Sequence, residues 1–210
     1  MKHAAMAGLA AGAAMMIGGA LAAVSDKELS DSRLLADSNA EIMNPMIGGQ
    51  AMLPDRDIMD NISASPLHSA LAAALKDTGI FTALKANGQF TVFAPTNAAF
   101  AAATTSPQPK SPDSKSSLAR RMSYLIVPGR YDSQALLKTI SEAGGTAKLR
   151  TAEGGILTAR MNGPTNIMVM DERGNIANIA IYDVRDKNGI VHVVDHMLEP
   201  GGPTRQVASR

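Results

Sequence analysis

The sequence predicts an α+β domain, with helices in its first part and a mainly antiparallel β region in its second. Apolar residues recur at helical spacing up to Gly144-Gly145, and short apolar runs follow from Leu149 onward. Turn residues separate these runs at regular intervals, which is typical of antiparallel strands. The 210 residues, of which 45% are hydrophobic, suffice for one domain with extensions and a packed core.

The composition excludes several classes of site and partner. Cys is absent, which excludes disulfides, thiolate metal sites and cysteine nucleophiles. The net charge is +1 and aromatic residues make up only 3%, so nothing favours binding to nucleic acid or to an anionic membrane. The 13 methionines indicate an aliphatic, Met-filled core.

Residues 1–23 are predicted to be a signal peptide. Lys2 gives a basic start, residues 4–24 carry no charge, and Ala20-Leu21-Ala22 fits the small-x-small pattern of a signal peptidase site. Cleavage directly after this triplet or one residue later implies a periplasmic, secreted or cell-surface protein without stable membrane insertion. A retained membrane anchor is the alternative. No Cys follows the apolar run, which excludes a lipid-anchored lipoprotein.

The rest of the chain is predicted to comprise an N-terminal arm at 24–56, a domain at 57–200 and a tail at 201–210. Two prolines and a Gly pair rule out a long regular element in the arm. We expect the arm to pack on the domain through a few Met and Ile side chains or to remain mobile.

The first helix of the domain is predicted to begin at Ser65-Pro66, because Ser caps helices and Pro fits their first position. Leucines then recur on one helical face, and Gly79 is expected to end the helix. His68 on this helix is interpreted as a surface or capping residue. A second short helix is expected at 80–84.

A strand-to-helix corner is predicted in "FTVFAPTNAAF" (90–100). The first four residues have β-branched or aromatic character. Pro95 ends the strand because it cannot donate a ladder hydrogen bond. Thr96 or Asn97 can then cap the helix that follows, and Phe100 is expected to face inward.

Two further helices are predicted before the β region. The Ser/Pro/Lys-rich residues 104–117 are expected to form a flexible insertion. A helix is expected from Leu118 toward Pro128-Gly129, which should end it. Another helix is expected to begin at 132–133.

Short strands are predicted at Leu149, Ile156–Met161, Ile167–Met170, Ile176–Ile181 and Ile190–Leu198. His192, between two valines, is interpreted as a buried, hydrogen-bonded core residue, and Asp195 as a backbone partner at the strand end. We expect the strands 90–94 and 190–195 to be neighbours in one sheet. His192 should then lie near the Thr96–Asn97 corner, where a hydrogen bond could lock the motif.

No catalytic, cofactor or metal site is predicted, because no hydrolase elbow, phosphate loop or dinucleotide fingerprint is present. His192 and His196 would lie about 13 Å apart on an extended strand, too far for one metal ion. "DVRDKNG" (183–189) fails as a calcium loop because Val184 would be its first ligand. A small-molecule or hydrolytic pocket near His192 and Asp195 stays open as the alternative to a binding module.

Three segments, "FTVFAPTNAAF" (90–100), "YLIVPGRY" (124–131) and "NGIVHVVDHML" (188–198), resemble in order and spacing the signature regions of the fasciclin domain family. The resemblance covers about residues 57–200 and extends to exported single-domain bacterial members. It implies helices packed on a wedge of two mainly antiparallel β-sheets. It also implies adhesion or matrix binding without established catalysis.

The residues that match the family motifs are Phe93, Pro95, Thr96 and Phe100 in the first, Tyr124, Pro128 and Gly129 in the middle one, and Asn188, Gly189, His192 and Asp195 in the last. The chain departs from the family at Leu125, where His is usual, at Asn97, where an acid is common, and at 104–117, which replace a more ordered stretch. The expected partner is a cell-surface or matrix protein or polysaccharide, and not nucleic acid.

Overall fold

The computed structural model describes residues 44–80, 82, 88–105 and 115–202, and all of them belong to one compact unit. Within this described part of the chain, no helix is long and apolar enough to cross a membrane. The predicted signal peptide, most of the short helix at 80–84 and most of the C-terminal tail lie outside the described residues.

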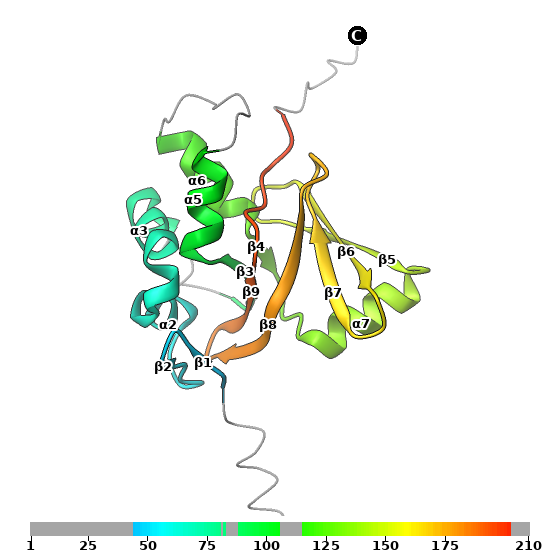
Figure 1. Cartoon of the computed structure of the whole chain (residues 1–210), viewed down its shortest axis with the longest axis horizontal. Helices are drawn as coiled ribbons and strands as arrows, with labels where there is room; N and C mark the ends of the chain where they lie inside the picture. Colours follow the sequence, from blue (N-terminus) through cyan, green and yellow to red (C-terminus); the bar gives the residue numbers. More distant parts are fainter. Residues whose placement is uncertain (1–43, 81, 83–87, 106–114, 203–210) are drawn as a thin grey trace, which may run out of the picture. The chain divides into compact units, whose positions relative to one another are not determined.

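The described helices are α2 (Ile58–Ala64), the 3₁₀ turn η1 (Pro66–His68), α3 (Ser69–Thr78), α5 (Asn97–Thr105), α6 (Lys115–Tyr124) and α7 (Ser133–Glu142). α3 contacts α2, α5 and α6, and Figure 1 shows these four helices grouped on one side of the strands. α7 lies apart from them, against β5 and β6. α3 ends as predicted at Gly79, whose φ of 77° is left-handed.

The strands are β1 (Met46–Ile47), β2 (Gln50–Ala51), β3 (Phe90–Pro95), β4 (Ile126–Pro128), β5 (Thr146–Arg150), β6 (Ile156–Asn162), β7 (Asn166–Met170), β8 (Ile176–Asp186) and β9 (Gly189–Val194). β1 and β2 form a small antiparallel hairpin. The others are hydrogen-bonded in the order β4-β3-β9-β8-β7-β6-β5. The pair β3–β9 is parallel and all other neighbouring pairs are antiparallel.

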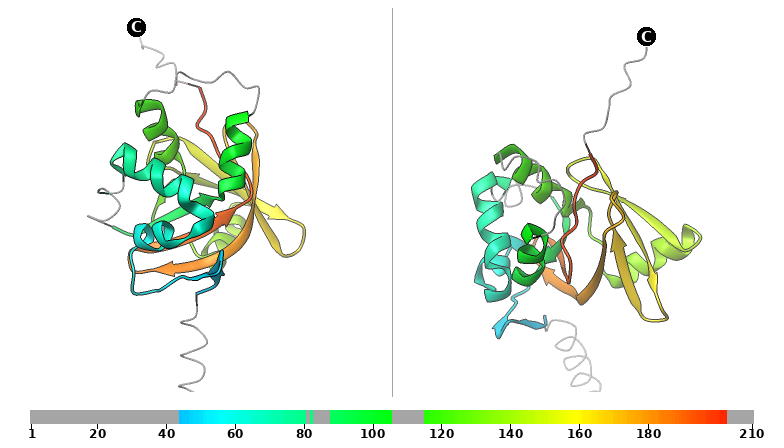
Figure 2. Two further views of the ribbon diagram at one scale, coloured as in Figure 1. Left: turned by 60° about the vertical axis from the view of Figure 1, so that its left-hand side comes forward. Right: turned by 45° about the horizontal axis from the view of Figure 1, so that its top comes forward.

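The long strand β8 joins two sheets. Its first residues, 176–178, pair with β7, whereas residues 179–186 pair with β9. Its register with β9 shifts twice, and such irregularities bend a strand. The first sheet is therefore β4-β3-β9-β8 and the second is β8-β7-β6-β5, and Figure 2 shows them diverging from β8. The predicted α+β class, with helices on a wedge of two sheets, is confirmed.

Burial follows the position of each strand. Every residue of β9 is buried, as expected for a central strand covered on both faces. In β5, β6 and β7 buried residues alternate with more exposed ones, so one face of the second sheet points to solvent. Ile47 and Met52, at the end of the predicted arm, are also buried in the core.

Three local predictions are wrong. The helix predicted to run to Pro128-Gly129 ends at Tyr124, and the next apolar residues form the edge strand β4. Pro is tolerated in β4 because one side of an edge strand has no neighbouring strand, so the missing N–H of Pro breaks no ladder hydrogen bond there. Both ends of the predicted flexible insertion at 104–117 are helical, since α5 extends to Thr105 and α6 begins at Lys115, while residues 106–114 lie outside the described part. His68 is buried rather than at the surface.

Candidate functional site

The three motif segments lie on adjacent strands of the first sheet. β3 and β9 pair from Phe90 opposite Gly189 to Pro95 opposite Val194, which confirms that they are neighbours. β4, from the middle motif, pairs with the other side of β3. The motifs therefore build one continuous part of the fold.

His192 is the centre of this arrangement and is fully buried. Its ring stacks on that of Phe93, with centroids 5.7 Å apart. Nδ1 accepts from the backbone N–H of Asp183 at 3.3 Å, so the ring proton is on Nε2, which donates to the Tyr131 carbonyl at 2.8 Å. Burial lowers the pKa of His192, outweighing the opposite effects of Tyr131 and the nearby carboxylates. The imidazole is a neutral bridge between β8, β9 and the 129–131 loop.

The prediction that His192 locks the Thr96–Asn97 corner is wrong, because His192 lies opposite Phe93 and bonds to Tyr131 instead. Thr96 caps α5 as predicted, accepting from the Ala99 N–H at 3.3 Å. Asn97 reaches the start of α3, where its Oδ1 accepts from the Ala70 N–H at 3.0 Å. Its Nδ2 donates to the carbonyl of Pro66 at 2.8 Å and to the Ser69 hydroxyl at 3.0 Å.

We expect Asn97→Ala to lower the free energy of unfolding by about 1–2 kcal/mol, because it removes hydrogen bonds that fasten α5 to α3. Urea unfolding measures this change. Asn166→Ala, on an exposed residue of β7, is the matched control and should change stability by less than about 0.5 kcal/mol. Equal stability of the two variants would show that the Asn97 contacts contribute nothing.

Tyr124 of the middle motif is also buried and bonded to backbone. Its hydroxyl donates to the Ile156 carbonyl at 2.8 Å and accepts from the Glu172 N–H at 3.2 Å. Burial is the main reason that the pKa of Tyr124 is raised. Leu125, where the family usually has His, lies in the core. Neither residue presents a functional group to solvent.

The loop after β4 is held by Thr91. The Thr91 hydroxyl donates to the Gly129 carbonyl at 2.8 Å and accepts from the Tyr131 N–H at 2.8 Å. Gly129 has a φ of 106°, which favours glycine. Pro128 is exposed at the end of β4. This loop thereby presents the Tyr131 carbonyl to His192.

The first residues of the last motif allow the parallel pairing of β9 with β3, and its final part, at Asp195, bonds to β8. The Asn188 side chain accepts from the Ile58 N–H at 2.9 Å, at the beginning of α2. A Cβ on Gly189 would lie 1.9 Å from the Phe90 carbonyl oxygen, so only glycine fits. Asp195 accepts from the Asn178 backbone N–H at 2.8 Å, as its interpretation as a backbone partner requires.

The structure does not pair His192 with Asp195. The carboxylate of Asp195 bonds to Asn178 and to His196 Nδ1, whereas both ring nitrogens of His192 bond to other backbone groups. Burial would raise the pKa of Asp195, but hydrogen bonds from Asn178 and His196 lower it below its usual value. Among the described residues, no group of three or more His, Cys, Asp or Glu could hold a metal ion.

Sequence reasoning missed three buried or bridging acids. The first is Asp183, whose carboxylate accepts from the backbone N–H of Ser133 at 2.6 Å and from its hydroxyl. Asp183 has a φ of 56° and lies where the β8 register shifts. It fastens the start of α7 to β8. Its neighbours in sequence give no signal for this role.

The second is Asp186, which is buried and accepts from the Asn61 amide. Its Oδ2 has no hydrogen-bond partner among the described residues. Burial raises the pKa of Asp186 to about 7, although the bond from Asn61 acts in the opposite direction. The same Asn61 amide donates to the Leu53 carbonyl at 2.8 Å, so this pair anchors the chain before α2.

Asp186 makes stability depend on pH. The pKa of its carboxyl is 3.8 in the unfolded chain and about 7 in the folded protein. Between these pH values the folded state therefore binds one proton more than the unfolded state. Stability should therefore fall as pH rises from about 4 to 7 and level off above. We expect Asp186→Asn to remove this loss and to be more stable than the parent by about 2 kcal/mol at pH 8, with similar stability near pH 4. Urea midpoints between pH 4 and 8 test this, with Asp77→Asn on the exposed side of α3 as the control; parallel curves for parent and Asp186→Asn would contradict it.

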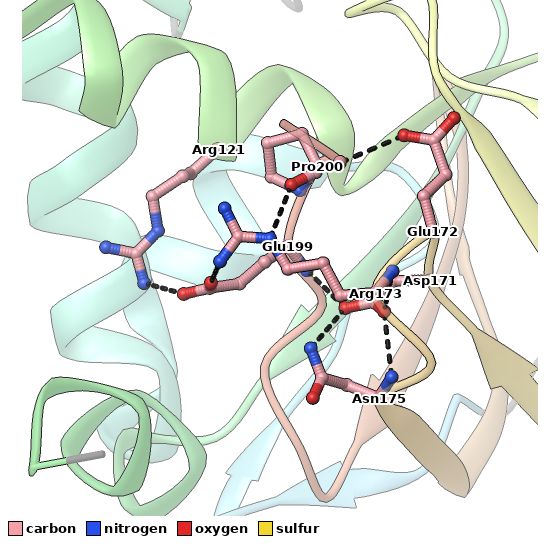
Figure 3. Close-up of polar contacts among 8 residues, drawn as sticks. Arg121, Asp171, Glu172, Arg173, Asn175, Glu199 and Pro200 are labelled. Atoms are coloured by element: carbon pink, nitrogen blue, oxygen red, sulfur yellow. Dashed lines mark hydrogen bonds and ion pairs between the residues drawn. The ribbon is translucent and has the colours of Figure 1, made fainter. Parts of the chain in front are cut away.

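The third is Asp171 in the β7–β8 turn, drawn in Figure 3. Its carboxylate accepts from the backbone N–H groups of Arg173 and Asn175 and from that of Glu199. Glu199 in turn bridges Arg121 of α6, at 2.8 Å, and Arg173, at 2.7 Å. This network fastens the segment after β9 to the second sheet and to α6.

A pocket of about 240 Å³ lies beside this network. It is lined by Ala99, Ala102, Ala103, Asn175, Ile176, His196, Met197 and Glu199. Its volume is below the ~300–1,000 Å³ of most small-molecule sites. Its lining includes His196, the neighbour of Asp195, but neither His192 nor Asp195 itself.

The comparisons with known proteins agree with the motifs. The fasciclin domain model matches residues 66–200. Protein sll1483 of Synechocystis is 33% identical over 146 residues, covering 68% of this chain and 73% of that protein. The pig transforming growth factor-beta-induced protein ig-h3 is 25% identical over 147 residues, which are 70% of this chain but only 20% of ig-h3.

Among solved structures, the chain is similar in fold to the FAS1 domain pair from the insect cell adhesion molecule Fasciclin I. The TM-score is 0.55 at 21% identity, and the match covers 71% of this chain and 53% of the domain pair. The sheet order, the motif residues and the family match over 66–200 lead to one conclusion. The chain belongs to the fasciclin domain family.

Proposed function

We propose that this protein is an exported, non-enzymatic adhesion module that binds a protein or polysaccharide of a cell surface or matrix. One observation carries the proposal: His192 and Tyr124, which could do chemistry, are buried and bonded to backbone groups. They stiffen the fold and leave binding to its exposed surface. The likeness to a domain pair of the insect cell adhesion molecule Fasciclin I supports the same class of function.

Capture of the mature protein on surface or matrix material tests this proposal. Cells and extracellular matrix of the source organism are incubated with labelled protein, and bound label is measured against concentration. Saturable capture that excess unlabelled protein displaces is the expected result. Absence of capture on every fraction would overturn the proposal.

Export is part of the proposal and rests on residues 1–23. We expect the full chain, expressed in a bacterial host, to lose its first 22 or 23 residues and to leave the cytoplasm. Fractionation and intact mass measurement check this directly. A protein of full-length mass confined to the cytoplasm would contradict it.

The hydrolytic alternative receives no support from the geometry. His192 is neutral, is buried and has no free ring nitrogen, and Asp195 has other partners. A general base must reach the proton that it abstracts, which His192 cannot do in this fold.

A further inference from the structure

We propose that the solvent-facing side of the second sheet binds an acidic polysaccharide through Lys148, Arg150 and Arg160. This inference rests on the proposed function and adds to it the class of partner and the binding surface. This outer face consists of Thr146, Lys148, Arg150, Ile156, Thr158, Arg160, Asn162, Asn166, Met168, Met170, Ile176 and Asn178, which are the less buried residues of the alternating strands. α7 contacts the same strands, β5 and β6 (Figure 1). The outer face nevertheless keeps exposed residues.

Strand register places the three cations in a row. Thr146 lies opposite Arg160, and Lys148 lies opposite Thr158. Arg160 is therefore diagonal to Lys148, and Arg150 follows Lys148 by two residues on β5. Each step is about 7 Å. The row crosses two strands and presents three positive charges to one side.

These charges are not neutralised within the described part of the chain. No hydrogen bond or ion pair is found there for the side chains of Lys148, Arg150 or Arg160, and the buried Nε of Arg160 has no hydrogen-bond partner. By contrast, Arg120 and Arg121 are each paired with a glutamate.

None of the outer-face residues is an Asp or a Glu. Acids that follow the ends of these strands are already engaged. Glu153 in the β5–β6 turn pairs with Arg120. Glu172 in the β7–β8 turn accepts from the N–H groups of Ile156 and Gly201. Asp195 accepts from Asn178. The outer face itself therefore carries positive charge only.

The neighbouring side chains favour a hydroxyl-rich polyanion. Threonine and asparagine side chains next to the row can bond to sugar hydroxyls, and arginine binds carboxylate or sulfate groups with two parallel hydrogen bonds. The described Phe and Tyr side chains are buried or packed on the core, so none is free to stack on nucleic-acid bases. Met168 and Met170 are half-buried, and Ile156 and Ile176 are 39% and 40% exposed. The apolar surface of this face is therefore scattered among polar and charged residues.

The test measures binding of the full mature chain to polygalacturonate, dextran sulfate and uncharged dextran. Vesicles of phosphatidylcholine with phosphatidylglycerol and single-stranded DNA serve as further probes. We expect binding to both acidic polysaccharides and none to dextran, weakening as salt increases. The triple variant Lys148→Gln/Arg150→Gln/Arg160→Gln should lose at least about tenfold in affinity.

The matched control is Lys76→Gln/Lys138→Gln/Lys187→Gln, which removes the same net charge from exposed positions elsewhere. Its affinity for the acidic polysaccharides should stay within about twofold of that of the parent. If the triple variant fails to fold, Lys148→Gln/Arg150→Gln on the exposed edge strand should still lose about threefold.

Three results overturn the inference: full affinity in the row variants, equal loss in the control, or binding to vesicles or DNA without binding to acidic polysaccharide. Saturable capture on matrix material without acidic-polysaccharide binding would leave the proposed function standing and remove this inference. Failure of both assays would remove both.

Discussion

Gly189→Ala is expected to prevent folding, at a cost above about 4 kcal/mol. The added Cβ would lie 1.9 Å from the Phe90 carbonyl oxygen, on the neighbouring strand of the parallel pair. Backbone cannot move away there without breaking the β3–β9 register on which all three motifs depend. Circular dichroism and urea unfolding of the purified variant measure the effect.

Gly163→Ala separates this clash from ordinary glycine strain. Gly163 has a φ of 77° but nothing within 4 Å of an added Cβ. Its replacement should cost only about 1 kcal/mol. A Gly189→Ala protein as stable as Gly163→Ala would show that the two strands are not packed as described.

His192→Ala is expected to lower the free energy of unfolding by about 3–5 kcal/mol. The change leaves a cavity beside Phe93 and removes the partners of the Tyr131 carbonyl and the Asp183 N–H. His192→Gln should cost less, because an amide can replace part of this bonding. Thermal and urea unfolding provide the measurement.

The control for this prediction is His196→Ala. The His196 side chain is 64% exposed, and its bond to the neighbouring Asp195 is the only one found among the described residues. Its loss should cost less than about 1 kcal/mol. If His192→Ala and His196→Ala had similar stability, His192 would not be the central bridge of the first sheet.

Much of the strand content was predictable because local chemistry determines it. β3 ends at Pro95 and β9 begins after Asn188, both positions that turn chemistry indicates. The parallel direction of the β3–β9 pair was not predictable, since a fully buried strand has the same apolar pattern in either direction. The run after Tyr124 was misassigned for a related reason: its continuous apolar residues fit a helix end or a short strand equally well.

The buried polar contacts were harder to predict, because their partners are distant in the sequence. The burial of His192 follows from its flanking valines, but its acceptor, the Tyr131 carbonyl, is 61 residues away. Asp186 and Asn61 are 125 residues apart. The sequence around each of them does not distinguish it from a surface residue, because the partner lies far away in the chain. The row of cations on the outer face could not be predicted either, because it depends on the register between β5 and β6. The alternation of apolar and polar residues does not specify that register.

In this protein the motif residues stabilise the fold, and we propose that exposed surface does the binding. Capture of His192→Gln on surface or matrix material, well below its unfolding temperature, tests this most directly. We expect a lower unfolding temperature with unchanged affinity per folded molecule. Lost affinity with unchanged stability would place His192 in the binding site and contradict it.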